Sequence, residues 1–494
     1  MLESIKSKLI LKLIFINIKK KLKLKLIKHN KNLMNKLNIG INDFKLYQTL
    51  KEFNKKYNIN LIDNETEKLE IEEIKIKDFN EIIDNIKQLE FDKLKELSLK
   101  YSLFSDITAL KELNFEKLEK LNLRGNYISN IDNFEKLNFK NLKELDLNYN
   151  ELIEINVLGK LKFDKLKILD LGRNKLKNIE FFEKMDFKEL TELYLNDNQI
   201  SDIKKLSKIK LDKLELLNLN KNLIGDINVL ENVNFINLKA LYLKDNKISD
   251  IQSLKNVNFE NLEILNLSYN PLKNIDILEY VNFKELKQLH LENTLISDLT
   301  VLALVKFDKL ELLDLDRNKI YSINIFQIVN FKELKYLYLF DNNISDISVF
   351  EIVNFEKLEE LYLGKNLISD IRVFGKVNFK NLKYLGLHYN RISNISILEE
   401  LKLDNLESLY LCHNKIRKID VLKKMDFKKL KKLNLNTNVI ENIDVLKEIN
   451  YKNLEILSLS NNAELNSNYC IDTFLYNLRN KIKYSNPKLK IINY

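Results

Sequence analysis

The sequence predicts an α/β solenoid: an arc or horseshoe with a parallel sheet on its concave side and short 3₁₀ or α-helical segments on its convex side. A string of the form Leu-x-x-Leu-x-Leu-x-x-Asn recurs every 24 residues, sixteen times, between Leu94 and Asn462. A Phe stands at a fixed place in most copies, and the whole chain contains only 8 Gly and 2 Pro to interrupt the pattern. A repeat that keeps its register over this length is typical of a solenoid, in which each unit contacts only its neighbours.

Two leucines on either side of one residue, as in Leu337 and Leu339, predict a short strand in each copy. Side chains alternate across a strand, so both leucines point to the same side and into a core. Parallel strands of successive copies then stack about 4.8 Å apart. The residue between the leucines and the residues just after them therefore lie on the open, concave face.

The Asn that ends the string predicts a polar ladder inside the fold. It is Asn in fourteen of the sixteen copies, and Ser102 and Thr294 replace it in the other two. A chain that turns after every strand leaves backbone N–H and C=O groups that are costly to bury without partners. An amide both donates and accepts hydrogen bonds, so we expect it to pair with the backbone of its own and neighbouring copies.

The second half of each copy predicts a short helix on the convex side. The run 249–257 begins with Ser-Asp, which suits a helix N-cap, and places an apolar residue at every third position, which fits a 3₁₀ segment. The Phe that follows, Phe259 in this copy, predicts an aromatic spine between the convex and concave layers.

The chain divides into four parts by this pattern. Residues 94–462 hold the sixteen repeats, and residues 66–93 imitate the unit in degraded form, which predicts an N-terminal capping repeat. Residues 463–494 predict a C-terminal cap with an amphipathic helix and a last strand. Residues 1–65 predict a basic helical segment.

The net charge of +10 is concentrated at one end of the chain. Residues 1–60 contain fifteen Lys against Glu3, Asp43 and Glu52, a charge of +12, which leaves −2 for the remainder. The solenoid is therefore nearly neutral, and we expect no nucleic acid to bind along it.

The sequence also bears on compartment and chemistry. Cys412 and Cys470 are too few for a disulfide framework, and the apolar run Leu9 to Ile18 is interrupted by Lys12 and lacks a cleavage site. That run is too short to span a membrane. We expect an intracellular protein, cytoplasmic or nuclear, without a membrane partner. No phosphate-binding loop, nucleophile elbow or zinc-protease motif occurs, so we expect no enzyme activity, cofactor or metal.

The units resemble leucine-rich repeats. The run Asn-x-Ile-Ser-Asp-Ile at 198–203, 246–251 and 342–347 is similar to the class found in bacterial internalins and in the regulatory subunit of protein phosphatase 1, whose repeats are usually slightly shorter. The resemblance covers the sixteen copies. It implies a scaffold that binds another protein, with phosphatase regulation as one alternative.

The basic segment resembles an F-box. Its runs Ile-Leu-x-x-Ile-Phe at 10–15, Leu-x-Leu-x-Leu-Ile at 22–27 and Asn-Lys at 30–31 are similar to an F-box core, although Lys-Ser-Lys at 6–8 replaces the usual Leu-Pro start. F-box proteins often use leucine-rich repeats to select substrates for ubiquitin ligation, so a ligase substrate receptor is an alternative function. The same residues also fit a helical packing segment or a basic helix on a membrane surface.

The concave face gathers aromatic side chains in copies eleven to fourteen. Exposed aromatic groups mark partner sites, and Tyr is enriched at binding hot spots. Alternatively, the tyrosines stabilise the sheet through cross-strand pairs of about 0.2–1 kcal/mol. We predict that a protein partner binds these nine residues: Tyr336, Tyr338, Phe340, Tyr362, Tyr384, His388, Tyr389, Tyr410 and His413.

The same face has a more acidic stretch and one Cys–His pair. His388 and Cys412 share a column in adjacent copies, but Gly364 and Asn436 flank them and no carboxylate orients the His, so we predict interface residues and neither a nucleophile nor a zinc site. The acidic stretch is mixed with Arg173, Lys221, Lys244 and Arg317, and its members are Asp146, Asp170, Asp197, Asp245, Glu292, Asp314 and Asp316.

Overall fold

The computed structural model of the protein describes residues 68–70, 94–103, 105–112, 115–185, 187–401, 403–425, 428–449, 453–462 and 488–492. The F-box-like segment 1–65, most of the expected cap 66–93 and the helix expected within 463–494 lie outside the described residues. The chain divides into two compact units. One consists of residues 1–170 with 184–186, and the other of residues 171–183 with 187–494.

In the first unit, parallel strands follow one another in chain order, and from β2 onward the paired residues are 24 apart. The strands are β1 (Lys68–Glu70), β2 (Glu96–Ser98), β3 (Lys120–Asn122), β4 (Glu144–Asp146) and β5 (Ile168–Asp170). The 3₁₀ segments are η2 (Thr108–Glu112), η3 (Asp132–Lys136) and η4 (Asn156–Lys160).

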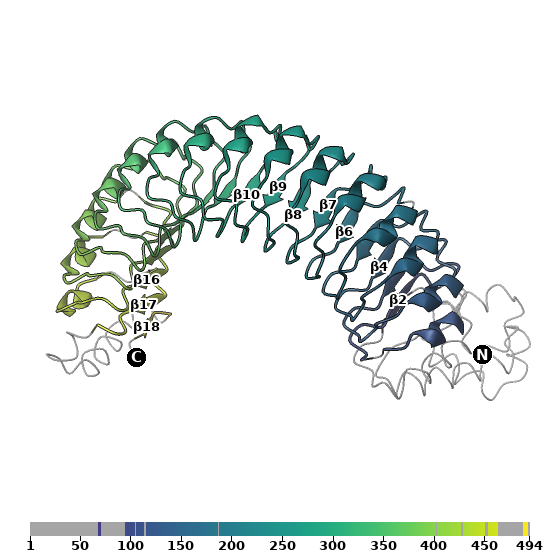
Figure 1. Cartoon of the computed structure of the whole chain (residues 1–494). Helices are drawn as coiled ribbons and strands as arrows, with labels where there is room; N and C mark the ends of the chain where they lie inside the picture. Colours follow the sequence, from purple (N-terminus) through teal and green to yellow (C-terminus); the bar gives the residue numbers. More distant parts are fainter. Residues whose placement is uncertain are drawn as a thin grey trace, which may run out of the picture. The chain divides into compact units, whose positions relative to one another are not determined.

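In the second unit, each strand again pairs in parallel with the next, for example Tyr338 with Tyr362. The sheet lies on the concave side of this unit and the 3₁₀ segments on its convex side (Figure 1). Its strands are β6 (Glu192–Tyr194), β7 (Leu216–Asn218), β8 (Ala240–Tyr242), β9 (Ile264–Asn266), β10 (Gln288–His290), β11 (Leu312–Asp314), β12 (Tyr336–Tyr338), β13 (Glu360–Tyr362), β14 (Tyr384–Gly386), β15 (Ser408–Tyr410), β16 (Lys432–Asn434), β17 (Ile456–Ser458) and β18 (Lys490–Ile492).

The convex elements between these strands are all short. Their bounds are η5 (Glu180–Lys184), η6 (Lys204–Lys208), η7 (Asn228–Asn232), η8 (Gln252–Asn256), η9 (Asp276–Tyr280), η10 (Thr300–Ala303), η11 (Asn324–Gln327), η12 (Ser348–Glu351), η13 (Arg372–Gly375), η14 (Ser396–Glu399), η15 (Asp420–Lys424) and η16 (Asp444–Lys447). The predicted solenoid, with a parallel concave sheet and 3₁₀ segments, is confirmed. Among the described residues, no helix has the length and apolar character needed to cross a membrane.

The Asn ladder is confirmed, and Asn342 shows how it works. Its Nδ2 donates to the carbonyl oxygens of Leu315 and Leu339 at 3.0 and 3.3 Å, and its Oδ1 accepts the N–H of Ile320 at 3.0 Å. The side chain is buried, at 7% exposure. One amide therefore satisfies backbone groups of two successive copies, which would otherwise be buried without partners.

The convex layer follows most of the expected chemistry. The N-cap residue of η8 is Ile251 and not the expected Ser or Asp, but Oδ1 of Asp250, one residue earlier, accepts the N–H of Gln252 at 2.8 Å. The Phe spine is buried, and the rings of Phe235 and Phe259 stack with centroids 6.3 Å apart. Columns of Leu, Phe and Asn occupy the interior. The positions whose residue type differs from copy to copy therefore lie on the concave and convex surfaces.

Candidate protein-binding surface

The nine predicted residues lie on β12 to β15 and in the turns that follow these strands. We call these nine residues the aromatic cluster. In the row between the leucines, Tyr338 is in register with Tyr362, Tyr362 with Gly386, and Gly386 with Tyr410. Tyr336 lies at the start of β12, in register with Glu360, and makes no ring contact with another described residue.

Four tyrosines of the cluster form a continuous series of ring contacts, and we call them the first row: Tyr338, Tyr362, Tyr384 and Tyr410. Tyr338 meets Tyr362 edge-on with centroids 4.7 Å apart, and Tyr362 stacks on Tyr384 at 4.3 Å. Tyr384 then lies 5.1 Å from Tyr410. Aromatic pairs at these distances contribute about 0.5–1.5 kcal/mol each beyond area burial, so this row is held in place before any partner arrives.

A second row runs beside the first. The ring of His388 stacks on Phe340, two copies earlier, with centroids 5.5 Å apart. Tyr389 stacks on His413 at 3.8 Å with an angle of 8° between the planes. Tyr389 and His413 both have a backbone φ of 54°, which lies in the left-handed region that residues other than Gly rarely adopt. His388 contacts Tyr410 at 6.5 Å and joins the two rows.

Two glycines make this packing possible, and the sequence analysis did not find their role. A Cβ at Gly364 would lie 2.5 Å from the His388 ring, and a Cβ at Gly386 would lie 3.0 Å from the Tyr384 ring. The glycines stand in columns where other copies carry larger residues, so the chain leaves room for the His388 ring of the next copy over Gly364 and for the Tyr384 ring of the same copy over Gly386. The signal in the sequence that could have indicated this role is that two of the 8 Gly stand in adjacent copies.

The cluster is more buried than strand alternation alone predicts. Tyr389 is 49% exposed, and the other eight side chains are half-buried because their neighbours cover them. Burial, with Glu360 and Asp314 nearby, raises the pKa of Tyr338 to about 12. Burial and a hydrogen bond from its hydroxyl to Glu360 also raise the pKa of Tyr362. The hydroxyls therefore remain protonated donors at neutral pH.

Carboxylates adjoin the cluster on β11 and in the turns after β10 and β11. Asp314 is in register with Tyr338, and Oδ1 of Asp316 accepts the N–H of Phe340 at 2.7 Å. Nδ1 of His290 lies 3.3 Å from Oδ2 of Asp314. We call Asp314, Asp316 and Glu292 the acidic end of the surface.

Glu292 is already paired within the chain. Its carboxylate accepts the Tyr269 hydroxyl at 2.7 Å and lies 3.3 Å from Nε of Arg317 and 3.4 Å from Nζ of Lys244. Asp316 differs, because within the described residues no Lys, Arg or His forms an ion pair with it. Burial and the neighbouring Asp314 raise the pKa of Asp316 to about 7.

Three further members of the predicted acidic stretch have contacts of their own within their units. Asp146 and Asp170 lie in register in the first unit, where both oxygens of Asp170 accept Nδ2 of Asn148 at 3.0 and 3.1 Å. Burial raises the pKa of Asp146 to about 6. In the second unit, Asp197 lies 3.5 Å from Nζ of Lys221.

The Cys412–His388 column is poorly suited to nucleophilic chemistry. The His388 ring lies over Gly364 and against Phe340, on the preceding copies, and its buried Nδ1 has no hydrogen-bond partner among the residues that the structure describes. Burial raises the pKa of the Cys412 thiol, whereas a reactive thiolate needs a lowered one. In the part of the chain that the structure describes, no three His, Cys, Asp or Glu residues cluster as metal ligands.

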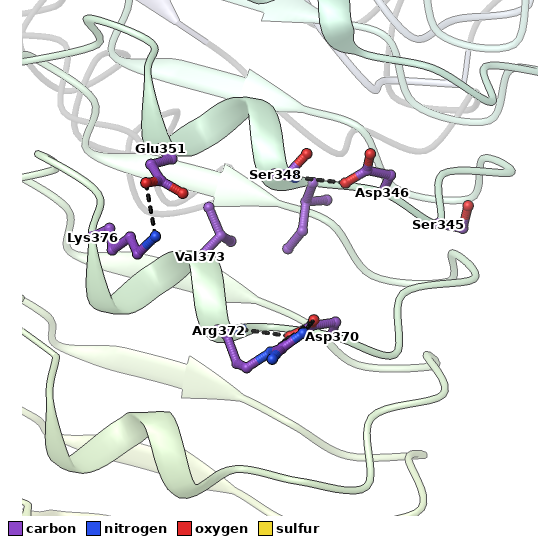
Figure 2. A pocket seen from close by; sticks show the side chains of 9 residues that line it. Ser345, Asp346, Ser348, Glu351, Asp370, Arg372, Val373 and Lys376 are labelled. Atoms are coloured by element: carbon purple, nitrogen blue, oxygen red, sulfur yellow. Dashed lines mark hydrogen bonds and ion pairs between the residues drawn. The ribbon is translucent and has the colours of Figure 1, made fainter.

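A hollow on the convex side is a product of the repeat. It lies between η12 and η13, and its charged groups pair with one another, with Nζ of Lys376 2.8 Å from Oε1 of Glu351 and Asp346 accepting the Ser348 N–H (Figure 2). A similar hollow recurs 48 residues on, beginning at Ser393. A recurring groove with satisfied charges does not mark a specific site.

The convex side also carries one apolar stripe. Tyr280, Leu304, Ile328 and Ile352 occupy the same position in four consecutive copies and are 64%, 53%, 61% and 64% exposed. Lys, Glu or Asn fills this position in the other copies from Glu112 to 448. The convex stripe is the alternative to the aromatic cluster as an apolar surface, and the only polar group among its four side chains is the Tyr280 hydroxyl, which hydrogen-bonds to Glu279.

Comparison with known proteins identifies the family. Residues 188–232, 236–280, 260–304, 332–376, 356–402, 380–424 and 404–448 match the family described as leucine-rich repeats in two copies. The chain is a leucine-rich repeat protein. No curated protein matches its sequence.

Solved structures share the fold. This leucine-rich repeat protein is similar to an internalin from Listeria monocytogenes, with 27% identity over 75% of this chain and 91% of that chain and a TM-score of 0.52. A leucine-rich repeat protein from Leptospira interrogans has 21% identity over 90% and 98%, with a TM-score of 0.57. The Arabidopsis receptor kinase HAESA, solved with the peptide hormone IDA and the co-receptor SERK1, has 22% identity over 77% and 67%, with a TM-score of 0.50.

Proposed function

We propose that this leucine-rich repeat protein is a non-enzymatic scaffold that binds a protein partner on the aromatic cluster of its concave face. The observation that carries the proposal is the unbroken series of ring contacts from Tyr338 to Tyr410 on an otherwise open sheet. The predicted alternative, that the tyrosines only stabilise the sheet, accounts for these contacts but not for the exposed area that the rings retain.

The cluster has the features of a binding hot spot. Partly exposed tyrosines offer apolar area together with hydroxyl donors, and truncating such residues at interfaces costs about 2 kcal/mol or more. Because stacked neighbours already restrict the rings, binding would order few side chains, which otherwise costs about 0.5–1.5 kcal/mol for each one. The surface is therefore organised before a partner binds.

The charges next to the cluster favour a protein over a nucleic acid. Asp314 and Asp316 adjoin Tyr338 and Phe340, and carboxylates there would repel phosphate groups. HAESA, which shares the fold, is seen with a peptide hormone, and that finding agrees with a polypeptide ligand on such a solenoid.

Affinity capture from the protein's own cells, read by mass spectrometry, tests the proposal. The triple variant Tyr338→Ala, Tyr362→Ala, Tyr410→Ala should lose the protein that the native chain retains, because the row of rings is removed. Tyr321→Ala is the matched control, since Tyr321 is 67% exposed and outside the cluster. Circular dichroism confirms that each variant is folded.

The triple Tyr→Phe variant separates binding from stability. It keeps the ring contacts, so it should fold with nearly native stability and retain most of the partner. Equal recovery of the partner by the native chain and the folded triple Ala variant would contradict the proposal and leave the tyrosines a structural role.

A further inference from the structure

The concave surface has two ends with different chemistry. Rings of Tyr362, Tyr384 and Tyr410 make one end apolar, whereas Asp314 and Asp316 make the other end acidic. The two ends are continuous, because Asp314 is in register with Tyr338 and Asp316 is bonded to the backbone of Phe340. A partner that covers the rings therefore also meets the carboxylates.

Within the acidic end, the three carboxylates are satisfied to different degrees. Glu292 has Arg317, Lys244 and the hydroxyl of Tyr269. Asp314 has His290 at 3.3 Å. Asp316 accepts one backbone N–H, and no cation among the residues that the structure describes pairs with it.

Such a carboxylate carries an energetic cost that a cation would relieve. Burial of a charge is unfavourable unless an opposite charge or several hydrogen bonds compensate it. Burial and the neighbouring carboxylates of Asp314 and Glu292 raise the pKa of Asp316 to about 7. The rings next to it favour the same occupant, since Arg317 already lies with its guanidinium carbon 6.0 Å from the Phe340 centroid.

We infer that the partner crosses β11 to β15 as an extended segment, with an Arg or Lys side chain at Asp316 and apolar or aromatic side chains against Tyr384 and Tyr410. This inference rests on the proposed function and specifies the chemistry of the partner. Four strand spacings of about 4.8 Å span roughly 19 Å, and an extended chain advances about 3.3 Å per residue. The cationic and apolar anchors are therefore about six residues apart.

Selection from a random dodecapeptide library displayed on phage, with the full chain as target at pH 8, tests the inference. Enriched peptides should carry Arg or Lys about six residues from an aromatic or large apolar residue. Binding of a synthetic enriched peptide to Asp316→Asn should be at least about tenfold weaker, because a charge-assisted contact is lost. Asp316→Lys should instead enrich peptides with Asp or Glu at that position.

A matched control is available one copy further on. Asp341→Asn removes a carboxylate that Nζ of Lys365 already pairs with at 2.7 Å, so peptide affinity should not change. Affinity for the native chain should fall between pH 8 and pH 6 as Asp316 takes up a proton, with Asp314, Glu292 and Arg317 around it and His290 paired with Asp314. Asp316→Asn should remove that part of the pH dependence.

The failures of the two proposals are distinguishable. Enriched peptides without a basic residue, or equal binding to Asp316→Asn, would overturn the inference, while the proposed function stands if those peptides require Tyr338, Tyr362 and Tyr410. Enrichment of no peptide would also overturn the extended cationic segment. Peptides that bind the folded triple Ala variant as well as the native chain would count against both proposals.

Discussion

The interior and the concave surface of this solenoid use polar groups in opposite ways. Inside the fold, the Asn342 amide pairs with the backbone of its own copy and of the preceding copy. Both its Nδ2 and its Oδ1 are therefore hydrogen-bonded. On the concave surface, no cation of the described residues forms an ion pair with Asp316, and none of these residues forms a hydrogen bond with Nδ1 of His388. Among the described residues, the amide inside the fold is satisfied within the chain, whereas these two groups on the concave surface are not.

The difference separates the positions that every copy needs in order to fold from the positions that the proposed function assigns to binding. The interior positions are nearly the same in every copy, because each copy must satisfy the same backbone groups. The aromatic cluster occurs in copies eleven to fourteen alone, although the strands there have the same backbone pairing as the others. Variation against a constant framework is what locates the site.

The largest expected effect comes from breaking the interior. Asn342→Ala should lower the free energy of unfolding by about 3–5 kcal/mol, since two carbonyls and the Ile320 N–H lose their partner while buried. Urea denaturation measures the loss. Asn343→Ala, an exposed neighbour, should change stability by less than about 0.5 kcal/mol, and equal losses would contradict the ladder.

Replacement of a glycine next to the aromatic cluster should change both the stability of the chain and its affinity for a partner. Gly364→Ala pushes the His388 ring away from Phe340, so it should cost about 1–3 kcal/mol and weaken partner binding. Gly225→Ala is the matched control, because its nearest neighbour, the Lys247 carbonyl oxygen, lies at an ordinary 3.6 Å. If both variants bind the partner normally, the leaning ring is not part of the site.

We expect the carboxylate of Asp316 to affect the free energy of unfolding. Its pKa of about 7 lies above the value of 3.8 for an unperturbed Asp, so the folded state holds the proton over a window that the unfolded state does not. The contribution of Asp316 to the free energy of unfolding therefore falls as pH rises from about 4 to 7. Asp316→Asn should stabilise the chain at pH 8 by about 1–2 kcal/mol, after allowance for solvent.

Denaturation of both forms at pH 5 and pH 8 checks this expectation. The gain from Asp316→Asn should be smaller at pH 5, where the native carboxyl is protonated. Equal stability of the two forms at pH 8 would show that Asp316 is compensated within the chain, and would remove the contrast with Asn342.

The smallest effect is expected at a hydroxyl. The Tyr338 hydroxyl has no hydrogen bond to another described residue, so Tyr338→Phe should change the free energy of unfolding by less than about 0.5 kcal/mol. Isothermal titration with an enriched peptide then shows whether the partner uses this hydroxyl. A large loss of stability would mean that the Tyr338 hydroxyl has a structural role of its own.

The sequence predicted the framework because its evidence is repeated. The Leu337 and Leu339 positions recur in sixteen copies, so strand, register, Asn ladder and 3₁₀ segment all follow from one 24-residue pattern. Strand alternation also predicted which residues share the concave face, since side chains of period two cannot change sides without shifting the register.

The orientation of the aromatic rings could not be predicted from the sequence. His388 turns across Gly364 to reach Phe340, two copies away, and Tyr384 leans over Gly386 to stack on Tyr362. Such choices depend on the space left by neighbouring copies and not on the residue itself. The isolation of Asp316 among paired charges was likewise invisible, because it depends on which cation reaches which carboxylate.

Site-specific photo-crosslinking tests the central claim most directly. The crosslinking amino acid p-benzoylphenylalanine would replace Tyr389, an exposed ring of the aromatic cluster, or Ile328 in the convex stripe, or Tyr321 as a control outside both surfaces. The account predicts a discrete crosslinked protein from position 389 in the protein's own cells and none from positions 328 and 321. A crosslinked partner from position 328, with none from 389, would contradict it.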